Sequence, residues 1–471
     1  MTRLRVAGGL ALAGLLSAAA APESALAHGL VGKQDLPIPR WLFAWAASLV
    51  LVASFVGLAA LWSTPRLQRV EERRRLLLPR WLEGLAGAAG IAGFGFVIYA
   101  GFAGQQNSTG NVVPTVVYVV FWVGVPFVSA VFGDVFRAVN PWLALGKAAG
   151  WLTRRVSDTV PEPLPYPERL GRWPAVIGVL AFAWVELTYA NKDDPSQLAV
   201  MALVYTAVQL VGMSLYGADT WSKRGDAFSV YFGMFARIAP LRWRDRALFT
   251  RPPLGGAPRL SAVPGTVALL CTMIGTTSFD GFSQGSLWTS MADRLQTFFG
   301  NLGFNAEHAL EAAGTVGLIM MVLLVSLLYR LGAAGMHDVN RRLPTGELAR
   351  RFAHTLVPIA LAYVVAHYFS LLAYQGQAMA YLVSDPLGTG ADEFGTASAA
   401  INYTWIGATG IWYVQCGALV VGHVAGLTLA HDRALAIYDD PKEANRSQYW
   451  MLAVMVAFTS LGLWLLSATA Q

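Results

Sequence analysis

Apolar segments about as long as a bilayer is thick recur along this chain of 471 residues, and they restrict its fold more than any other feature. Inside the hydrocarbon layer, backbone N–H and C=O groups find partners only within their own segment, so each apolar segment should be an α-helix. The sequence therefore predicts an all-α fold, a polytopic bundle of about ten transmembrane helices. The predicted spans are 41–62, 82–103, 112–132, 173–190, 197–217, 262–279, 308–330, 353–376, 405–430 and 448–468.

The composition agrees with a membrane protein. Hydrophobic residues make up 55% of the chain and charged residues 13%, whereas a soluble domain carries about 25% charged residues. None of the stretches between the apolar segments is long enough to bury a hydrophobic core of its own. We therefore expect residues 28–471 to form a single transmembrane helical domain.

The first 27 residues have the features of a cleavable signal peptide. Arg3 and Arg5 precede a short apolar run, which is too short for the roughly 20 residues that a membrane span needs. Ala25-Leu26-Ala27 matches the small-residue pattern of a signal-peptidase site. Cleavage there would make His28 the mature amino terminus. Without cleavage, the segment 1–27 would be an anchor and would add one span.

Basic residues are distributed unevenly between the two sides of the predicted bundle. If the mature N-terminus lies outside, the inner segments hold 28 of the 34 Lys and Arg residues. These segments are 63–81, 133–172, 218–261, 330–352 and 431–447. Because cytoplasmic loops carry such an excess, both termini are predicted to lie outside, in a bacterial inner membrane. The high pI then reflects topology, so nucleic acid is not an expected partner, while the run Arg73-Arg74-Arg75 could touch anionic lipid headgroups.

Small residues and amphipathic patterns predict where some helices lie. A series of glycines in the span 82–103 would let neighbouring helices approach closely, so this span is expected inside the bundle. The stretches 140–152 and 225–241 have the pattern of amphipathic helices that lie on the inner surface.

Three of the polar residues in the eighth and ninth spans are candidates for a function. An ionisable group in mid-membrane costs roughly 2.5–3.5 kcal/mol on insertion scales, so His367 and His423 each need a reason to be there. With Gln415 they form a candidate polar path across the membrane. The alternative is that each histidine only donates a hydrogen bond to a neighbouring helix.

A second set of polar residues gathers on the outer side of the bundle. Glu186, Asp280 and Glu311 are candidate catalytic acids or bases, and Glu307 and His308 open the seventh span. An amino-terminal His28 would offer its amine and its imidazole as metal ligands. His28, His308 and Glu307 therefore form a candidate site for copper or zinc. The alternative is that these exposed side chains are simply solvated.

Other motifs are missing from the sequence. It has no Gly-rich nucleotide loop followed by Lys and Ser or Thr, so this chain alone is not expected to hydrolyse ATP. It also lacks an H-E-x-x-H zinc helix, a C-x-x-C-H haem site and a G-x-S-x-G elbow.

The chain contains HGLVGKQDLPIPRWLFAW after the signal, then DAFSVYFGMFARIAP, GTVALLCTMIGTTSFDGFSQG and GHVAGLTLAHDRALAIYDD with the SQYWMLAVMVAFTSLGLWLLS that follows it. Together these segments resemble a bacterial membrane-protein family labelled fenitrothion hydrolase. The resemblance implies a membrane-associated enzyme that hydrolyses organophosphorus esters, with other membrane subunits as expected partners besides the lipid bilayer. It assigns no role to any individual residue.

These features support three hypotheses. The first is a metal-dependent hydrolase of organophosphorus-type esters with its site on the outer face, where bound copper or zinc would activate water. The second is a transporter or channel for a metal ion or small solute, which would use His367, Gln415 and His423. The third is a non-catalytic subunit of a membrane complex. Depth separates the first two, because a hydrolase needs only external residues whereas a transporter needs the mid-membrane histidines.

Overall fold

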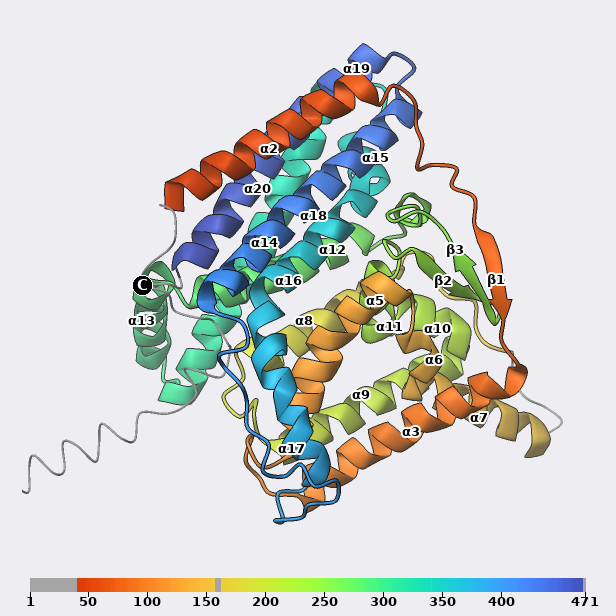
Figure 1. Cartoon of the computed structure of the whole chain (residues 1–471), viewed down its shortest axis with the longest axis vertical. Coiled ribbons are helices and arrows are strands. Elements are labelled where there is room, and N and C mark those ends of the chain that lie inside the picture. Colours follow the sequence, from red (N-terminus) through yellow and green to blue (C-terminus); the bar gives the residue numbers. More distant parts are fainter. Residues whose placement is uncertain (1–39, 157–161, 340, 469–471) are drawn as a thin grey trace, which may run out of the picture.

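All ten predicted spans are helical in the computed structural model, which describes residues 40–156, 162–339 and 341–468 (Figure 1). The corresponding helices are α2 (Arg40–Leu61), α3 (Arg80–Ala103), the segment Val112–Phe132, α8 (Trp173–Leu187), α9 (Pro195–Tyr216), α12 (Thr266–Ser283), α14 (Ala306–Val339), α16 (Leu356–Gln375), α18 (Ala408–Ile437) and α20 (Tyr449–Ala468). The predicted signal peptide and His28 lie outside the described residues.

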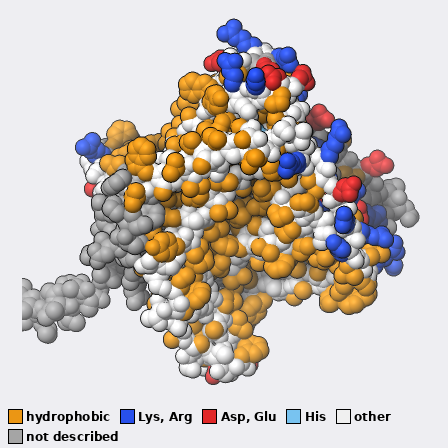
Figure 2. Space-filling model, turned by 45° about the horizontal axis from the view of Figure 1, so that its top comes forward, with side chains coloured by type: hydrophobic (Ala, Val, Ile, Leu, Met, Phe, Trp, Pro, Cys, Tyr) orange, Lys and Arg blue, Asp and Glu red, His pale blue; other side chains and the backbone are white. Residues whose placement is uncertain are grey.

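Six helical segments of the described chain are long and apolar enough to cross a membrane. They are Arg80–Ala103, Val112–Phe132, Pro195–Tyr216, Ala306–Val339, Thr345–Ser384 and Ala408–Ile437. Figure 2 shows hydrophobic side chains over the flank of the bundle, with most of the visible Lys and Arg side chains gathered toward its ends. The chain is therefore a multi-pass helical membrane protein.

Shorter helices connect the spans or lie beside them. They are α6 (Phe136–Val139), α7 (Pro141–Val156), α10 (Ala218–Arg224), α11 (Ala227–Phe235), α13 (Ser286–Asn301), α15 (Thr345–Phe352), α17 (Met379–Ser384) and α19 (Pro441–Ser447). The amphipathic α7 exposes Trp151 and Leu152 and buries Trp142 and Leu143, as expected for a helix on a surface.

The centre of the bundle is formed by α12 and α16, which are buried along most of their length. The polar residues of α12 are tolerated there because they bond to their own helix. Thr276 and Thr277 donate their hydroxyls to the carbonyls of Thr272 and Met273, at 2.9 and 3.1 Å. The hydroxyl groups of Thr276 and Thr277 are thus satisfied although they lie at the centre of the bundle.

Helices α16 and α18 pack in close contact because two glycines of α18 face α16. A Cβ atom at Gly422 would lie 2.2 Å from Ala362 Cβ and 2.8 Å from the Pro358 carbonyl oxygen. Gly426, one turn along, lies just as closely against the Thr355 carbonyl. Small residues four apart let two helix backbones touch, which gains dispersion contacts in the absence of a hydrophobic driving force.

Helix α3 lies at the edge of the bundle, so the expectation of an interior position was wrong. One face packs on α6, α7 and α9, where Gly90 touches the Val139 carbonyl and Gly101 touches Ala199. The other face is open, since nothing lies within 4 Å of a Cβ placed at Gly84 or Gly93. The glycines therefore mark one packing face and do not show that the whole helix is buried.

The second predicted surface helix is also placed differently. Within 225–241, α11 buries seven of its nine residues in the core, among them Phe228, Tyr231 and Phe235. A helix that is apolar on all sides has no face for water, so burial is its stable position.

The span Val112–Phe132 contains a segment of unusual helical geometry. After the short α4 (Val112–Pro114), the π-helix η2 runs from Thr115 to Gly124 and is followed by α5 (Val125–Phe132). π-helical turns are rare, usually short and frequent at functional sites. This one carries Tyr118 and Trp122 toward the centre of the bundle.

A small antiparallel sheet, absent from the sequence prediction, covers one end of the bundle. Its strands are β1 (Arg73–Leu77), β2 (Leu241–Arg244) and β3 (Ala247–Thr250), in the order β1-β3-β2. Asp245 and Arg246 have φ values of 49° and 63° and make the two-residue turn between β2 and β3. Positive φ at both positions is typical of a type I′ hairpin.

The arginine-rich segments predicted to share one side are joined at this end. Arg433 donates to the Pro258 carbonyl at 2.7 Å, and Arg137 pairs with Asp219 at 2.6 Å. We refer to this end as the arginine-rich end and to the other as the opposite end.

Candidate functional site

Three helices far apart in the sequence bring Glu186, Asp280 and His367 together inside the bundle. Asp280 Oδ2 lies 2.8 Å from His367 Nε2, and their side chains are 2% and 6% exposed. Glu186, at the end of α8, is also buried and lies close enough to Asp280 for a strong charge interaction. We call these three residues the acid–histidine cluster.

Tyr368 lies between the two acids of the cluster. Its hydroxyl interacts with the carboxyl groups of both Glu186 and Asp280. Its ring meets the His367 ring edge-on, with centroids 4.8 Å apart and planes at 82°. Because consecutive residues of a helix point about 100° apart, α16 can present His367 to one acid and Tyr368 to both.

Aromatic side chains enclose Glu186. Trp122 of the π-helix lies next to its carboxyl group and stacks on Tyr231 of α11, with centroids 4.5 Å apart and an interplanar angle of 12°. Phe182 lies against the same indole at 4.5 Å. The buried position of α11 is thus what brings Tyr231 to the cluster.

One oxygen of this site has no hydrogen-bond partner. Among the described residues, neither Glu186 Oε2 nor Trp122 Nε1 makes a hydrogen bond, although both atoms are buried. An unsatisfied buried polar atom costs about 1–3 kcal/mol, so proteins keep few of them. The arrangement can bind a small charged species, such as a proton, that would satisfy the oxygen.

The other outer candidates lie in a different setting. Glu307 and His308 are exposed at the start of α14, and within the described chain their side chains make no hydrogen bond or ion pair. Glu311 Oε1 accepts the backbone N–H of Ala190 at 3.1 Å and so ties α14 to the loop after α8.

The candidate copper or zinc site is incomplete in this structure. Its third residue, His28, lies outside the described residues. Within the described ranges, no three His, Cys, Asp or Glu side chains gather in a way that could hold a metal ion. The metal site therefore stays a prediction from the sequence.

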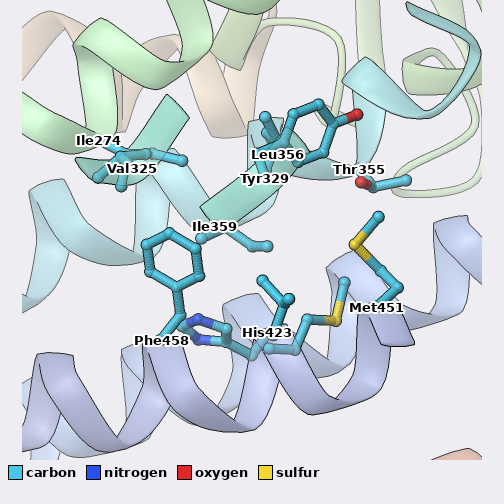
Figure 3. Close-up of a pocket in the computed structure, with 11 residues that line it drawn as sticks. Ile274, Val325, Tyr329, Thr355, Leu356, Ile359, His423, Met451 and Phe458 are labelled. Carbon is cyan, nitrogen blue, oxygen red and sulfur yellow. The ribbon is translucent and has the colours of Figure 1, made fainter. Parts of the chain in front are cut away.

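The remaining polar candidates, Gln415 and His423, are buried in α18. His423 Nδ1 lies 2.7 Å from the Leu419 carbonyl of its own helix, and its Nε2 has no partner among the described residues. The ring borders a cavity of about 20 Å³ whose other walls include Ile359, Met451 and Phe458 (Figure 3). The surroundings of His423 are thus mainly apolar, unlike those of His367.

Sequence reasoning missed three aromatic residues at the site, Trp122, Tyr231 and Tyr368. Trp122 had a signal, because tryptophan favours the membrane interface and this one lies in mid-span. For Tyr231 the signal was the lack of a polar face on α11, which favours a buried position for this helix. Tyr368 had none beyond its position next to His367.

Comparison with protein-family models, with curated proteins and with solved structures finds no match for the chain. The fold and the acid–histidine cluster therefore carry the functional argument on their own.

Proposed function

We propose that this protein transports protons, alone or coupled to a solute, through the acid–histidine cluster. The observation that carries the proposal is the buried contact of 2.8 Å between Asp280 and His367, with Glu186 as a second acid beside it. Ionisable residues are expensive inside a membrane and, in pumps and transporters, chains of acids and histidines relay protons.

Charge balance explains why such a cluster would handle protons. A protonated His367 and an ionised Asp280 form a neutral pair, whereas an ionised Glu186 adds a second buried negative charge beside Asp280, opposed by the charge of Lys192. Burial disfavours that net charge, so a proton on the cluster stabilises it. A change in access from one side of the membrane to the other would then release that proton.

The surroundings of the cluster support transport better than ester hydrolysis. A hydrolase with an outer-face site needs no buried histidine, yet the buried His367 lies 2.8 Å from Asp280. Glu307 and His308, two proposed metal ligands, are exposed and lie outside the cluster. Organophosphorus ester hydrolysis rests on the family resemblance alone.

The proposal includes a topology of ten spans with both termini outside a bacterial inner membrane. Helices cover the ten predicted segments, and six helical segments of the described chain are long and apolar enough to cross a membrane. In the proposed topology, the segments that hold 28 of the 34 basic residues fall on the inner side. The cluster then lies toward the outer ends of α8 and α12.

The test is a pH jump applied to the full chain reconstituted on a solid-supported membrane. Proton binding at a site inside the membrane displaces charge and gives a transient current, whether or not a coupled solute is known. We expect Asp280→Asn, His367→Gln and Glu186→Gln to remove most of the current. The matched control is His423→Gln, a buried histidine outside the cluster, which should leave it unchanged.

Two results would overturn the proposal. The first is a wild-type response that all three cluster variants retain. The second is hydrolysis of fenitrothion, with copper or zinc added, that survives Asp280→Asn but is lost in His308→Ala. If the protein shows neither current nor hydrolysis and co-purifies with other membrane proteins, the subunit hypothesis replaces both.

A further inference from the structure

The sheet at the arginine-rich end has an exceptional charge. Residues 63–80 and 237–259, which contain its three strands, hold twelve arginines, three acidic residues and no lysine. The net charge of these two segments is therefore +9. We call β1, β2 and β3, with the flanking Arg237, Arg251 and Arg259, the arginine sheet.

The interior of the arginine sheet has too few acids for its arginines. Glu72 alone pairs with Arg242 at 2.6 Å, Arg259 at 2.7 Å and Arg251 at 3.5 Å. Arg251 also donates to the carbonyls of Ala236 and Ala239, at 2.9 and 3.0 Å. Three guanidinium groups on one carboxylate leave a local excess of positive charge.

Arg237 adds to this excess. Burial and the neighbouring charges of Arg251 and Arg242 together lower the pKa of its guanidinium to about 10. Those neighbours repel it, and an anion bound nearby would relieve the repulsion.

The strand register brings further arginines together. Arg74 and Arg242 both pair with Phe249 of β3, one from each side, so all three side chains lie in one row across the sheet. Arg73 pairs with Thr250 in the next row, and Arg75 Nε donates to the Thr250 hydroxyl at 3.0 Å. Arg74 and Arg242 lie on the two outer strands with Phe249 between them, so the sheet carries positive charge along both of its edges.

The position of β1 places these arginines close to the membrane. The strand crosses the arginine-rich end between two spans, from the end of α2 toward the start of α3 (Figure 1). Leu77 is three residues before Arg80, the first residue of α3, and so lies within roughly 10 Å of it. Leu76 and Leu77 are 51% and 54% exposed, although they are apolar.

We propose that the arginine sheet binds the phosphate groups of anionic phospholipids. Guanidinium groups match a phosphate with two parallel hydrogen bonds, which explains the use of arginine without lysine. The exposed Leu76 and Leu77 can contact the acyl chains of a lipid, whereas a free phosphate ion has no apolar part for them to contact. Each basic residue near an anionic surface adds to such binding.

The test uses the full chain in detergent, with phosphatidylglycerol or phosphatidylcholine added, and counts retained lipids by native mass spectrometry. We expect the wild type to retain phosphatidylglycerol preferentially. The variant Arg73→Gln/Arg74→Gln/Arg75→Gln removes three exposed charges and should lower its affinity for phosphatidylglycerol roughly tenfold or more. The lysine variant Arg73→Lys/Arg74→Lys/Arg75→Lys keeps the charge and should lose less.

The matched control is Arg341→Gln/Arg350→Gln/Arg446→Gln, which removes three exposed arginines from the same end but outside the sheet. It should bind phosphatidylglycerol as the wild type does. Thermal unfolding of each variant checks that it is folded, and the lysine variant keeps the test decisive if the glutamine variant is not. Equal retention of the two lipids by the wild type would overturn the proposal. Displacement of phosphatidylglycerol by inorganic phosphate at equal concentration would overturn the lipid assignment and point to a free-phosphate site.

Discussion

Two buried acids of this protein, Asp432 and Glu186, have similar neighbours but differ in how fully their carboxylate oxygens are hydrogen-bonded. Asp432, at the arginine-rich end, is fully buried and accepts hydrogen bonds from Trp62 Nε1 at 3.1 Å, Gln68 Nε2 at 2.7 Å and the backbone N–H groups of Arg66 and Leu67. His431 beside it contacts the Trp62 carbonyl at 2.9 Å. Glu186 also has an indole nearby and lies beside the Asp280–His367 pair, yet its Oε2 has no partner among the described residues.

The difference separates a structural acid, Asp432, from Glu186, the acid that we propose to be functional. Every hydrogen bond of Asp432 goes to the loop after α2, so this carboxylate fastens that loop to α18. A carboxylate that is fully hydrogen-bonded gains nothing from a proton. The unsatisfied oxygen of Glu186 stabilises nothing as it stands, and it keeps the capacity to bind a proton. From residue type alone, the roles of Asp432 and Glu186 could not be told apart.

The largest loss of stability should come from removing Asp432, whose carboxylate is fully hydrogen-bonded. Asp432→Ala leaves the partly buried donors of Trp62, Leu67 and Gln68 without their acceptor, and we expect a loss of about 3–5 kcal/mol in the free energy of unfolding. Thermal and SDS unfolding in detergent would measure it. The control is Asp439→Ala, at the same end, whose side chain is 96% exposed and whose loss should cost under about 1 kcal/mol. Equal effects of the two substitutions would contradict the structural role of Asp432.

A smaller loss of stability is expected at Asp194, a hydrogen-bonded acid on the surface. Asp194 caps α9 by accepting the backbone N–H groups of Ser196 and Gln197 at 2.8 and 3.0 Å. Asp194→Ala should cost about 1 kcal/mol near neutral pH. Asp193→Ala, which removes a charge but no cap, is the control.

The cost of Asp194→Ala should depend on pH. The hydrogen bonds from Ser196 and Gln197 hold the pKa of the Asp194 carboxyl below its ordinary value of 3.8. A lowered pKa in the folded state means that the stabilisation is complete above the unfolded-state pKa and is lost as the pH falls through the folded value. The difference between wild type and variant in thermal unfolding should therefore shrink in strongly acidic buffer. A difference that grows with acidity would contradict the capping role.

The smallest effect on stability, and the largest on function, is expected at Glu186. Glu186→Gln removes an acid with an unsatisfied oxygen from beside a second acid, so the folded state should be unchanged or more stable by up to about 1 kcal/mol. The pH-jump current should nevertheless disappear. Glu311→Gln is the control, since Glu311 makes its hydrogen bond to Ala190 and lies outside the cluster. A clear loss of stability in Glu186→Gln would show that this acid is structural, like Asp432.

The sequence predicts the three residues of the acid–histidine cluster as candidates, but it does not predict that they lie together. Asp280 and Glu186 were expected with outer-face metal ligands, and His367 with Gln415 and His423. The structure instead joins Asp280 to His367 and places Glu186 next to them. Helical periodicity shows which face a residue occupies, but it does not show which helix that face meets.

The positions of the helices were determined by the sequence alone. An apolar segment of about 20 residues must satisfy its own backbone in hydrocarbon, and that condition is local. The tertiary structure decided that α11 is buried, that the two arginine-rich segments pair as strands, and which acids are satisfied. The donors to Asp432 lie more than 360 positions away in the chain, and His367 lies 87 positions from Asp280. Contacts of that separation depend on how the helices pack, which no local pattern records.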